Sequence, residues 1–342
     1  MNRLPPDGIP VPAPALRDLV RALSVRAGLP EDKANLLAEL LVSNDLRGVF
    51  SHGSRQIATY ARLMRDGMLN PRPQVAVVNE SPATLLLDGD AGLGYFPSWQ
   101  AAQVLVEKAR AVGVAAGVTR HHGHFGAAGL YTRVAAAAGL IGYDTSGVQL
   151  KLEPGMPLLA AAGGSPMSFA VPSGAVEGRG GESSRLAGEQ PPLVLDFGAI
   201  HDLYNASTER LTYMMEHLPS TLMRSFGLGA LCQVLGGFLA GVPLDESRAV
   251  RRYPGANQGA LFVFIDPARF INPATLRQEM DAYHRTVAQL EPFPETGDRA
   301  TLPGRLEWER ERQWAETGVP VGSRHRDELE KVAAEFDVPV PW

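Results

Sequence analysis

Hydrophobic side chains recur at helical spacing in the first part of the chain. Leu16, Leu19, Val20 and Leu23 fall on one face of a helix, which predicts a helix over residues 15–27. The same criterion, combined with acidic starts and with glycine or proline stops, predicts further helices. These cover residues 32–47, 55–67, 97–112, 127–138, 226–239, 273–289, 305–317 and 325–336. Residues 14–69 therefore form a small helical unit, and the helix at 226–239, apolar on nearly every side, is expected to be buried.

Short runs of apolar and β-branched residues lie between these helices and predict strands. They cover residues 75–78, 84–88, 114–119, 140–145, 167–171, 193–196 and 260–266. Helices and strands are mixed along the chain without an internal repeat, which indicates an α/β or α+β protein. The segment 174–191 is polar and rich in glycine, so we predict a mobile loop there.

The composition excludes several classes of protein. The 342 residues carry a formal net charge of −5, which argues against a nucleic-acid-binding surface. Cys232 is the single cysteine, so an intrachain disulfide and a multi-cysteine zinc site are both excluded. The sequence contains no stretch of about 18 apolar residues that could span a membrane. Its start, MNRLPPDGIPVPAP, lacks the apolar core of a signal peptide, and we expect a cytoplasmic protein.

The motif Ser51-His52-Gly53 follows the predicted helix 32–47 and offers a candidate proton donor. A histidine with a hydroxyl neighbour and a glycine has a hydrogen-bonding partner and little steric cover, as general acid catalysis requires. The alternative is a simple turn in which the histidine caps the last carbonyls of the helix.

A second histidine-rich motif runs from His121 to Gly126, between a strand and an alanine-rich helix. Backbone N–H groups at such a helix start can bind a phosphate or another anion. A structural turn and a metal site are the alternatives, although consecutive histidines do not point to one place and no carboxylate lies nearby. Asp196 ends a predicted buried strand, where it either orients a histidine or closes a turn.

No standard dinucleotide, P-loop, nucleophile-elbow or zinc-protease motif is present. Instead, several segments together resemble the non-Rossmann malate/L-lactate dehydrogenase family, whose members include sulfolactate and ureidoglycolate dehydrogenases, diketogulonate reductases and cyclic-imine carboxylate reductases. The resemblance runs over residues 14–322 and rests on the order of the motifs. These are DLRGVFSHG from Asp45, DGDAGLG from Asp88, HFGAAGLY from His124, PLVLD ending at Asp196, and FVFIDPARF from Phe262.

The family resemblance implies a fold that the residue pattern alone does not. It predicts an α/β protein like L-sulfolactate dehydrogenase, with a mixed sheet in a non-Rossmann cofactor domain and a helical domain built from both chain ends. The expected helical domain is 1–75 plus 300–342, and the expected cofactor domain is 76–299. The resemblance also implies NAD or NADP as cofactor, a small carboxylate substrate, a homodimer, and neither a metal nor a nucleic-acid partner.

The resemblance assigns roles to individual residues. Ser51, His52 and Asp196 are the expected catalytic residues, and Arg55, Gln56 and His124 the expected substrate-binding residues. The expected cofactor-binding residues are His124, Phe125, Gly126, Ala127, Thr145, Ser165 and Arg224.

Several positions on the cofactor side depart from the family pattern. Arg224 stands where the family has lysine, and it cannot serve as a titrating amine. Ser165 stands where the family has asparagine, and the segment after Asp196 is shorter than usual. The main hypothesis is an oxidoreductase that transfers a hydride between NAD(P)H and a 2-oxo acid, a 2-hydroxy acid or a cyclic imine carboxylate. The alternative is a repurposed homologue that has lost the dinucleotide site and performs a non-redox acid/base reaction or binds a ligand.

Overall fold

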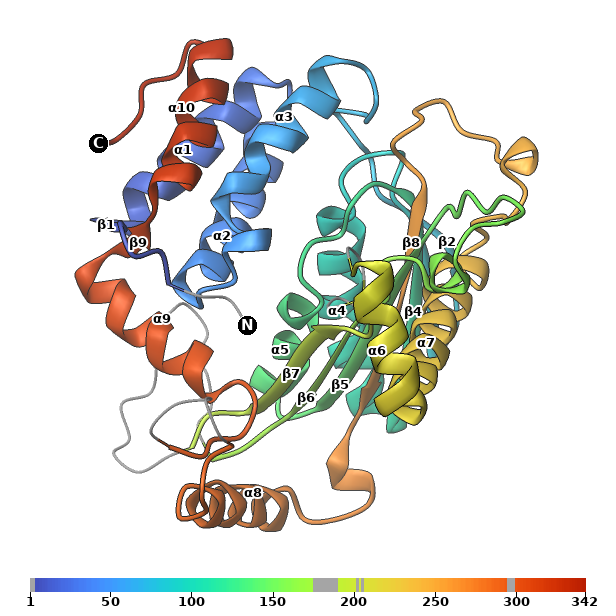
Figure 1. Ribbon diagram of the computed structural model, residues 1–342, viewed down its shortest axis with the longest axis vertical. Coiled ribbons are helices and arrows are strands. Elements are labelled where there is room, and N and C mark those ends of the chain that lie inside the picture. The colour runs from blue at the N-terminus through green and yellow to red at the C-terminus, as the bar shows by residue number, and fades with distance from the viewer. Residues whose placement is uncertain (1–3, 175–189, 201–202, 204–205, 294–298) are drawn as a thin grey trace.

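The computed structural model describes residues 4–174, 190–200, 203, 206–293 and 299–342. A seven-stranded mixed sheet forms its centre, in the order β2-β3-β4-β8-β5-β6-β7 (Figure 1). Neighbouring strands are antiparallel except β3 and β4, which are parallel. The strands are β2 (Ala76–Glu80), β3 (Thr84–Asp88), β4 (Val114–His122), β5 (Ile141–Val148), β6 (Pro166–Val171), β7 (Leu193–Gly198) and β8 (Gln258–Ile265).

Helices α4 (Tyr95–Val112) and α5 (Gly129–Ala137) pack against this sheet. Small side chains permit the close approach: a β-carbon on Gly142 would lie 2.9 Å from the Ala135 side chain. Further along the chain come α6 (Thr208–His217), α7 (Pro219–Cys232) and α8 (Pro273–Val287). A π-helical segment, Gln233–Phe238, continues α7 and contacts β5 and β8.

Both chain ends build a helical domain, as the resemblance predicts. Helices α1 (Ala13–Arg26), α2 (Glu31–Leu46) and α3 (Ile57–Arg65) pack with α9 (Arg305–Thr317) and α10 (Ser323–Glu335) (Figure 1). Strand β1 (Ile9–Val11) pairs antiparallel with β9 (Val319–Val321) and joins the two ends. The mixed sheet and this helical domain confirm the predicted fold class. The division at residues 75 and 300 stays a prediction.

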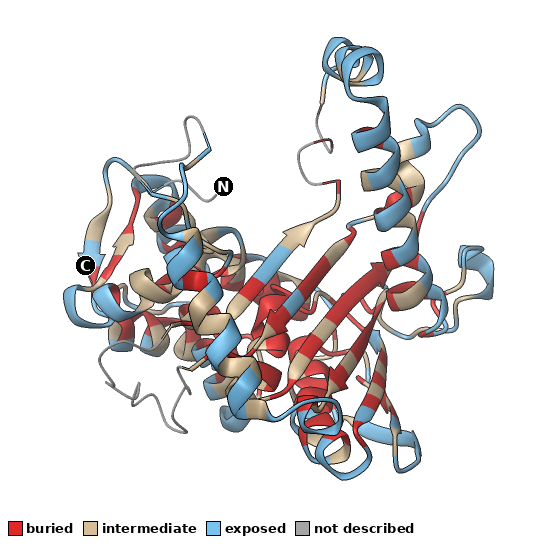
Figure 2. Cartoon of the chain, turned by 90° about the horizontal axis from the view of Figure 1, so that it is seen from below, coloured by how far each residue is buried: buried red, intermediate tan, exposed pale blue. Residues whose placement is uncertain are grey.

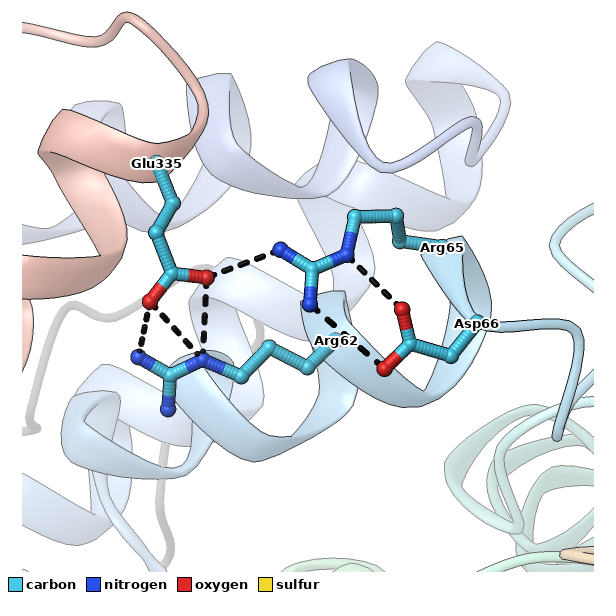
Figure 3. Close-up of polar contacts among 4 residues, drawn as sticks. All are labelled: Arg62, Arg65, Asp66 and Glu335. Carbon is cyan, nitrogen blue, oxygen red and sulfur yellow. Dashed lines mark hydrogen bonds and ion pairs between the residues drawn. The ribbon is translucent and has the colours of Figure 1, made fainter.

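An ion-pair cluster connects α10 to α3 on the surface of the helical domain (Figure 3). Glu335 accepts from Nη2 of Arg62 at 2.6 Å and from Nη1 of Arg65 at 2.8 Å. Asp66 accepts from Nε of Arg65 at 2.8 Å. The two arginines hold the pKa of Glu335 at about 2. Because these side chains are solvent-exposed, the cluster fixes orientation more than it adds stability.

The predicted helix at 226–239 differs from the observed structure in bounds and in burial. The α-helix begins earlier, at Pro219, and changes to π-helix after Cys232. The small residues, not the large ones, face the sheet: a β-carbon on Gly236 would lie 2.3 Å from the Ser146 backbone. The large apolar residues are exposed instead, each by 40–57%: Leu228, Leu231, Val234, Phe238 and Leu239. The expected burial is therefore wrong for the single chain. In Figure 2 the buried residues are concentrated in the strands of the sheet and in the helices beside them.

Helix α6 and strands β1 and β9 have no counterpart among the predicted elements. Most of the predicted mobile loop at 174–191 lies outside the described residues. Within the described ranges, no helix has both the length and the apolarity to cross a membrane.

Candidate active site

The Ser51-His52-Gly53 motif forms a tight loop between α2 and α3, built from two 3₁₀ turns. The end of α2 holds it in place, since Asn44 Nδ2 donates to the His52 carbonyl at 2.9 Å. Asp45 Oδ2 accepts from the Ser54 backbone N–H at 2.8 Å. Ser51 Oγ lies 2.9 Å from His52 Nδ1, which fixes that side of the ring.

The C-terminal helices support the same loop from the other side. Phe50 stacks on Trp314 of α9 with ring centroids 5.9 Å apart. Ser54 Oγ lies 3.0 Å from His325 Nε2 of α10. Burial lowers the pKa of His325 to about 4, so this histidine is neutral at pH 7. Residues from both ends of the chain therefore position His52.

His124 follows β4 and comes to lie beside His52. The two ring centroids are 5.4 Å apart, at an angle of 34°. Nδ1 of His124 is 2.6 Å from the Tyr60 hydroxyl, which in turn is 3.2 Å from the Tyr95 hydroxyl. Burial, together with the charges of His52 and His122, lowers the pKa of His124 to about 3. The site thus contains one histidine that is held neutral next to another that hydrogen-bonds to a serine.

The other two histidines of the 121–126 motif have separate partners. His121 Nδ1 lies 2.8 Å from Asp88 Oδ2. His122 is buried between Thr119 Oγ1, at 2.9 Å from Nε2, and the Gly123 carbonyl, at 2.7 Å from Nδ1. No group of three potential metal-binding side chains occurs in the described part of the chain.

Asp196 lies on β7 and accepts from the Gly129 N–H, at the start of α5, at 2.9 Å. Asp144, Ser168 and Asp196 are cross-strand neighbours on β5, β6 and β7, so their side chains share one face of the sheet. Asp196 keeps exposed surface in the single chain, yet protein atoms surround its carboxylate. This desolvation raises its pKa to about 6, against the opposing effect of the Gly129 N–H. Burial and the Asp196 charge also raise the pKa of Asp144 well above its usual value.

Arg55 and Gln56, two of the expected substrate-binding residues, differ in their surroundings. Gln56 Nε2 donates to the Ser51 carbonyl at 2.6 Å, so its amide stabilises the loop. The charge of Arg55 acts electrostatically on both Asp45 and His325.

The expected cofactor-binding residues fall into a buried group and an exposed arginine. Phe125, stacked on Tyr131, and Ala127 are buried and shape the site through packing. Thr145 donates to the Pro166 carbonyl at 2.7 Å. The buried Ser165 hydroxyl has no hydrogen-bond partner in the described ranges. Arg224 is exposed on α7.

Four polar residues of the site carry no role in the sequence analysis: Asp45, Tyr60, Tyr95 and Asp144. Asp45 is the first residue of the DLRGVFSHG motif, but the motif does not indicate its hydrogen bond to Ser54. Tyr60 and Tyr95 occupy buried positions of α3 and α4. The hydrogen-bond partners of their hydroxyls lie on other elements, so the neighbouring sequence does not indicate them.

Residues 11–180 and 206–330 match the family described as malate/L-lactate dehydrogenase. The chain is 26% identical over 323 residues to L-sulfolactate dehydrogenase of Methanocaldococcus jannaschii, covering 90% of this chain and 92% of that protein. The structure of malate dehydrogenase from Pyrococcus horikoshii is similar, with a TM-score of 0.81 at 24% identity, covering 99% and 98% of the two chains. The structure of Δ1-piperideine-2-carboxylate reductase from Pseudomonas syringae gives a TM-score of 0.68 at 20% identity, covering 95% and 100%. The fold thus agrees with the family match, and the chain belongs to the malate/L-lactate dehydrogenase family.

Proposed function

We propose that this protein is an NAD(P)H-dependent oxidoreductase that acts on a small 2-oxo or 2-hydroxy acid or on a cyclic imine carboxylate. The observation that supports it most is the pair of adjacent histidines, His52 and His124. Two neighbouring titratable groups in different environments are typical of a site that separates proton transfer from substrate binding. Family membership adds the reaction class.

In this proposal His52 gives a proton to the substrate oxygen or imine nitrogen during reduction and takes it back during oxidation. Ser51 holds the ring through Nδ1 at 2.9 Å. The family resemblance assigns to Asp196 the role of favouring the protonated imidazole by its charge. Arg55 pairs with the substrate carboxylate, and Gln56 holds the loop through the Ser51 carbonyl.

The cofactor, when bound, supplies or accepts the hydride. Two features of this chain fit a dinucleotide. The Ser165 hydroxyl is buried without a partner in the described ranges and can bind a polar group. Arg224 is an exposed cation whose planar guanidinium suits bidentate pairing with a phosphate or carboxylate. We assign the residues from His124 to Ala127 to the lining of the proposed cofactor site.

We further propose a cytoplasmic homodimer. The exposed apolar residues of α7 and the π-helical segment form a continuous stretch of the kind that protein interfaces cover. The single cysteine, Cys232, is buried and suits a reducing compartment.

Titration of the purified protein with NADH and NADPH, followed by fluorescence, tests the proposal. Saturable binding of either cofactor, followed by turnover of a 2-oxo acid or a cyclic imine carboxylate, is the expected result. If neither cofactor binds at millimolar concentration, the oxidoreductase proposal fails and the non-redox homologue is favoured.

A further inference from the structure

We propose that Tyr60, the middle member of a hydrogen-bond relay with Tyr95, fixes the tautomer of His124, with its ring proton on Nε2. The relay makes His124 a permanent N–H donor beside His52. Its use for binding a substrate oxygen rests on the proposed function, whereas the tautomer does not.

The relay joins three elements that are far apart in the sequence. Tyr60 lies in α3, Tyr95 begins α4, and His124 follows β4. Tyr60 and Tyr95 are 1% and 0% exposed, so water does not reach either hydroxyl freely. The hydroxyls are 3.2 Å apart, and Tyr60 Oη is 2.6 Å from His124 Nδ1.

Counting hydrogens gives the direction of the relay. Two contacts connect Tyr95, Tyr60 and His124, and each contact holds one hydrogen. If the imidazole proton is on Nε2, the two hydroxyl hydrogens fill both contacts: Tyr95 donates to Tyr60, and Tyr60 donates to Nδ1. If the proton is on Nδ1, three hydrogens compete for two contacts, and one hydroxyl hydrogen has no acceptor among the described residues.

Leaving a buried donor unsatisfied is unfavourable. We therefore expect the Nε2–H tautomer to dominate by about tenfold, which corresponds to 1.4 kcal/mol. The Nε2–H group lies on the side of the ring away from Tyr60. Because His124 is only partly buried, this group has access to a ligand or to water.

The backbone around the relay limits its movement. Gly126 has a φ of +89°, and a β-carbon there would lie 2.5 Å from the ring of Tyr95 and 2.6 Å from its hydroxyl. The close approach of the chain at residue 126 therefore holds the Tyr95 ring. Tyr60 packs edge-to-face on Tyr95, with ring centroids 5.8 Å apart. Tyr60 and Tyr95 act through His124 and are positioning residues.

Nitrogen-15 NMR of histidine-labelled protein tests the relay without any substrate. We expect His124 to show an unprotonated, hydrogen-bonded Nδ1 and a protonated Nε2 at pH 7, with the signal assigned by its loss in His124→Gln. A protonated Nδ1 in the wild-type protein would overturn the proposal.

Two matched variants, each lacking one buried hydroxyl, separate the relay from a general packing effect. Tyr60→Phe removes the donor to Nδ1, so the Nδ1 signal should shift towards a mixture of tautomers. In Tyr95→Phe the Tyr60 hydroxyl hydrogen still fills the contact with His124 Nδ1, so the tautomer with its proton on Nε2 should persist. An unchanged Nδ1 signal in Tyr60→Phe would contradict the relay. The same mixture of His124 tautomers in both variants would also contradict it.

If the proposed function holds, turnover should follow the same order. In Tyr60→Phe the donor survives only in the fraction of His124 that keeps its proton on Nε2, so we expect turnover to fall in proportion to that fraction. The loss in Tyr95→Phe should be smaller. A larger loss in Tyr95→Phe than in Tyr60→Phe would contradict the relay. A protein with the expected tautomers but no turnover would contradict the proposed function alone.

Discussion

The carboxylate of Asp45 lies against Gly53, and a β-carbon at residue 53 would be 1.7 Å from Asp45 Oδ1. Gly53 has a φ of −90°, a value that any residue adopts, so glycine is required for space and not for backbone conformation. The contact lets the His52 loop approach the end of α2, where Asp45 and Asn44 hold it. Asp45 Oδ1 is buried there without a hydrogen-bond partner in the described part of the chain.

Gly53→Ala should therefore displace the loop and His52 with it. Turnover should fall by about 100-fold, since displacement of a catalytic group by about 1 Å has costs of that order. Steady-state kinetics and thermal unfolding measure the effect. Gly67→Ala is the control, because Gly67 has a φ of +69° and nothing within 4 Å of its β-carbon position. That variant should lose some stability through backbone strain and keep its activity; a fully active Gly53→Ala enzyme would contradict the contact.

Asp45→Asn should change how stability depends on pH. Burial raises the pKa of Asp45 from 3.8 to about 7, although the Ser54 N–H and Arg55 oppose the shift. Between these values the folded protein holds a proton that the unfolded chain has lost. The wild-type free energy of unfolding therefore loses up to about 1.4 kcal/mol per pH unit from this group as pH rises.

Asparagine does not titrate, so the free energy of unfolding of Asp45→Asn minus that of wild type should rise from about pH 4 to 7 and then level off. Urea unfolding at several pH values measures this difference. The difference is the quantity to follow, because His122, His124 and His325 have lowered pKa values and act on the wild-type curve in the opposite direction. Asp66→Asn serves as the control, since the pKa of Asp66 is lowered from 3.8 and its difference should change only below about pH 4 and stay flat above it. A flat difference for Asp45→Asn would mean that Asp45 is charged at pH 5.

His52→Ala should lower turnover far more than cofactor affinity, because general acid catalysis contributes about 100- to 10,000-fold. Kinetics and fluorescence titration measure the two effects separately. If Asp196 acts through His52, the losses in His52→Ala and Asp196→Asn should not add in the double variant. Wild-type turnover in His52→Ala would refute the assignment, and additive losses would refute the coupling.

Arg224 offers a test of dinucleotide binding. Arg224→Lys keeps the charge and should retain part of the NADH or NADPH affinity, whereas Arg224→Ala should abolish it. Because Arg224 is exposed, neither change should lower the melting temperature appreciably. Unchanged affinity in the alanine variant would place the cofactor elsewhere.

The exposed apolar stretch predicts that the protein is a dimer in solution. Replacing Leu231 and Val234, which are 49% and 46% exposed, with arginine should give a folded monomer, because unpaired charges would be buried in the interface. Light scattering coupled to size exclusion measures the mass. Phe270→Arg, at a 74% exposed position outside the stretch, should remain a dimer. A wild-type monomer at every concentration would refute the prediction.

Local sequence determined most of the secondary structure. Helix α9 spans Arg305–Thr317 and strand β3 spans Thr84–Asp88, both as predicted. These signals are local, because a helix or strand is specified by which of its own faces is apolar and by the residues that end it. The hydrogen bond between Ser51 and His52 could also be predicted from the sequence, because the two residues are adjacent in the chain.

Tertiary structure alone decided which side chains meet and what covers each apolar face. Ser54 and His325 are 271 positions apart, and Tyr60 and His124 are 64 apart, so no spacing rule connects them. The helix at 226–239 shows the same limit, because periodicity describes how apolar a face is and not which surface packs on it. There, glycines allow the backbone to contact β5, and the large apolar side chains are turned outward. Burial depends on the shape and position of the neighbouring elements, and these exist only once the chain has folded.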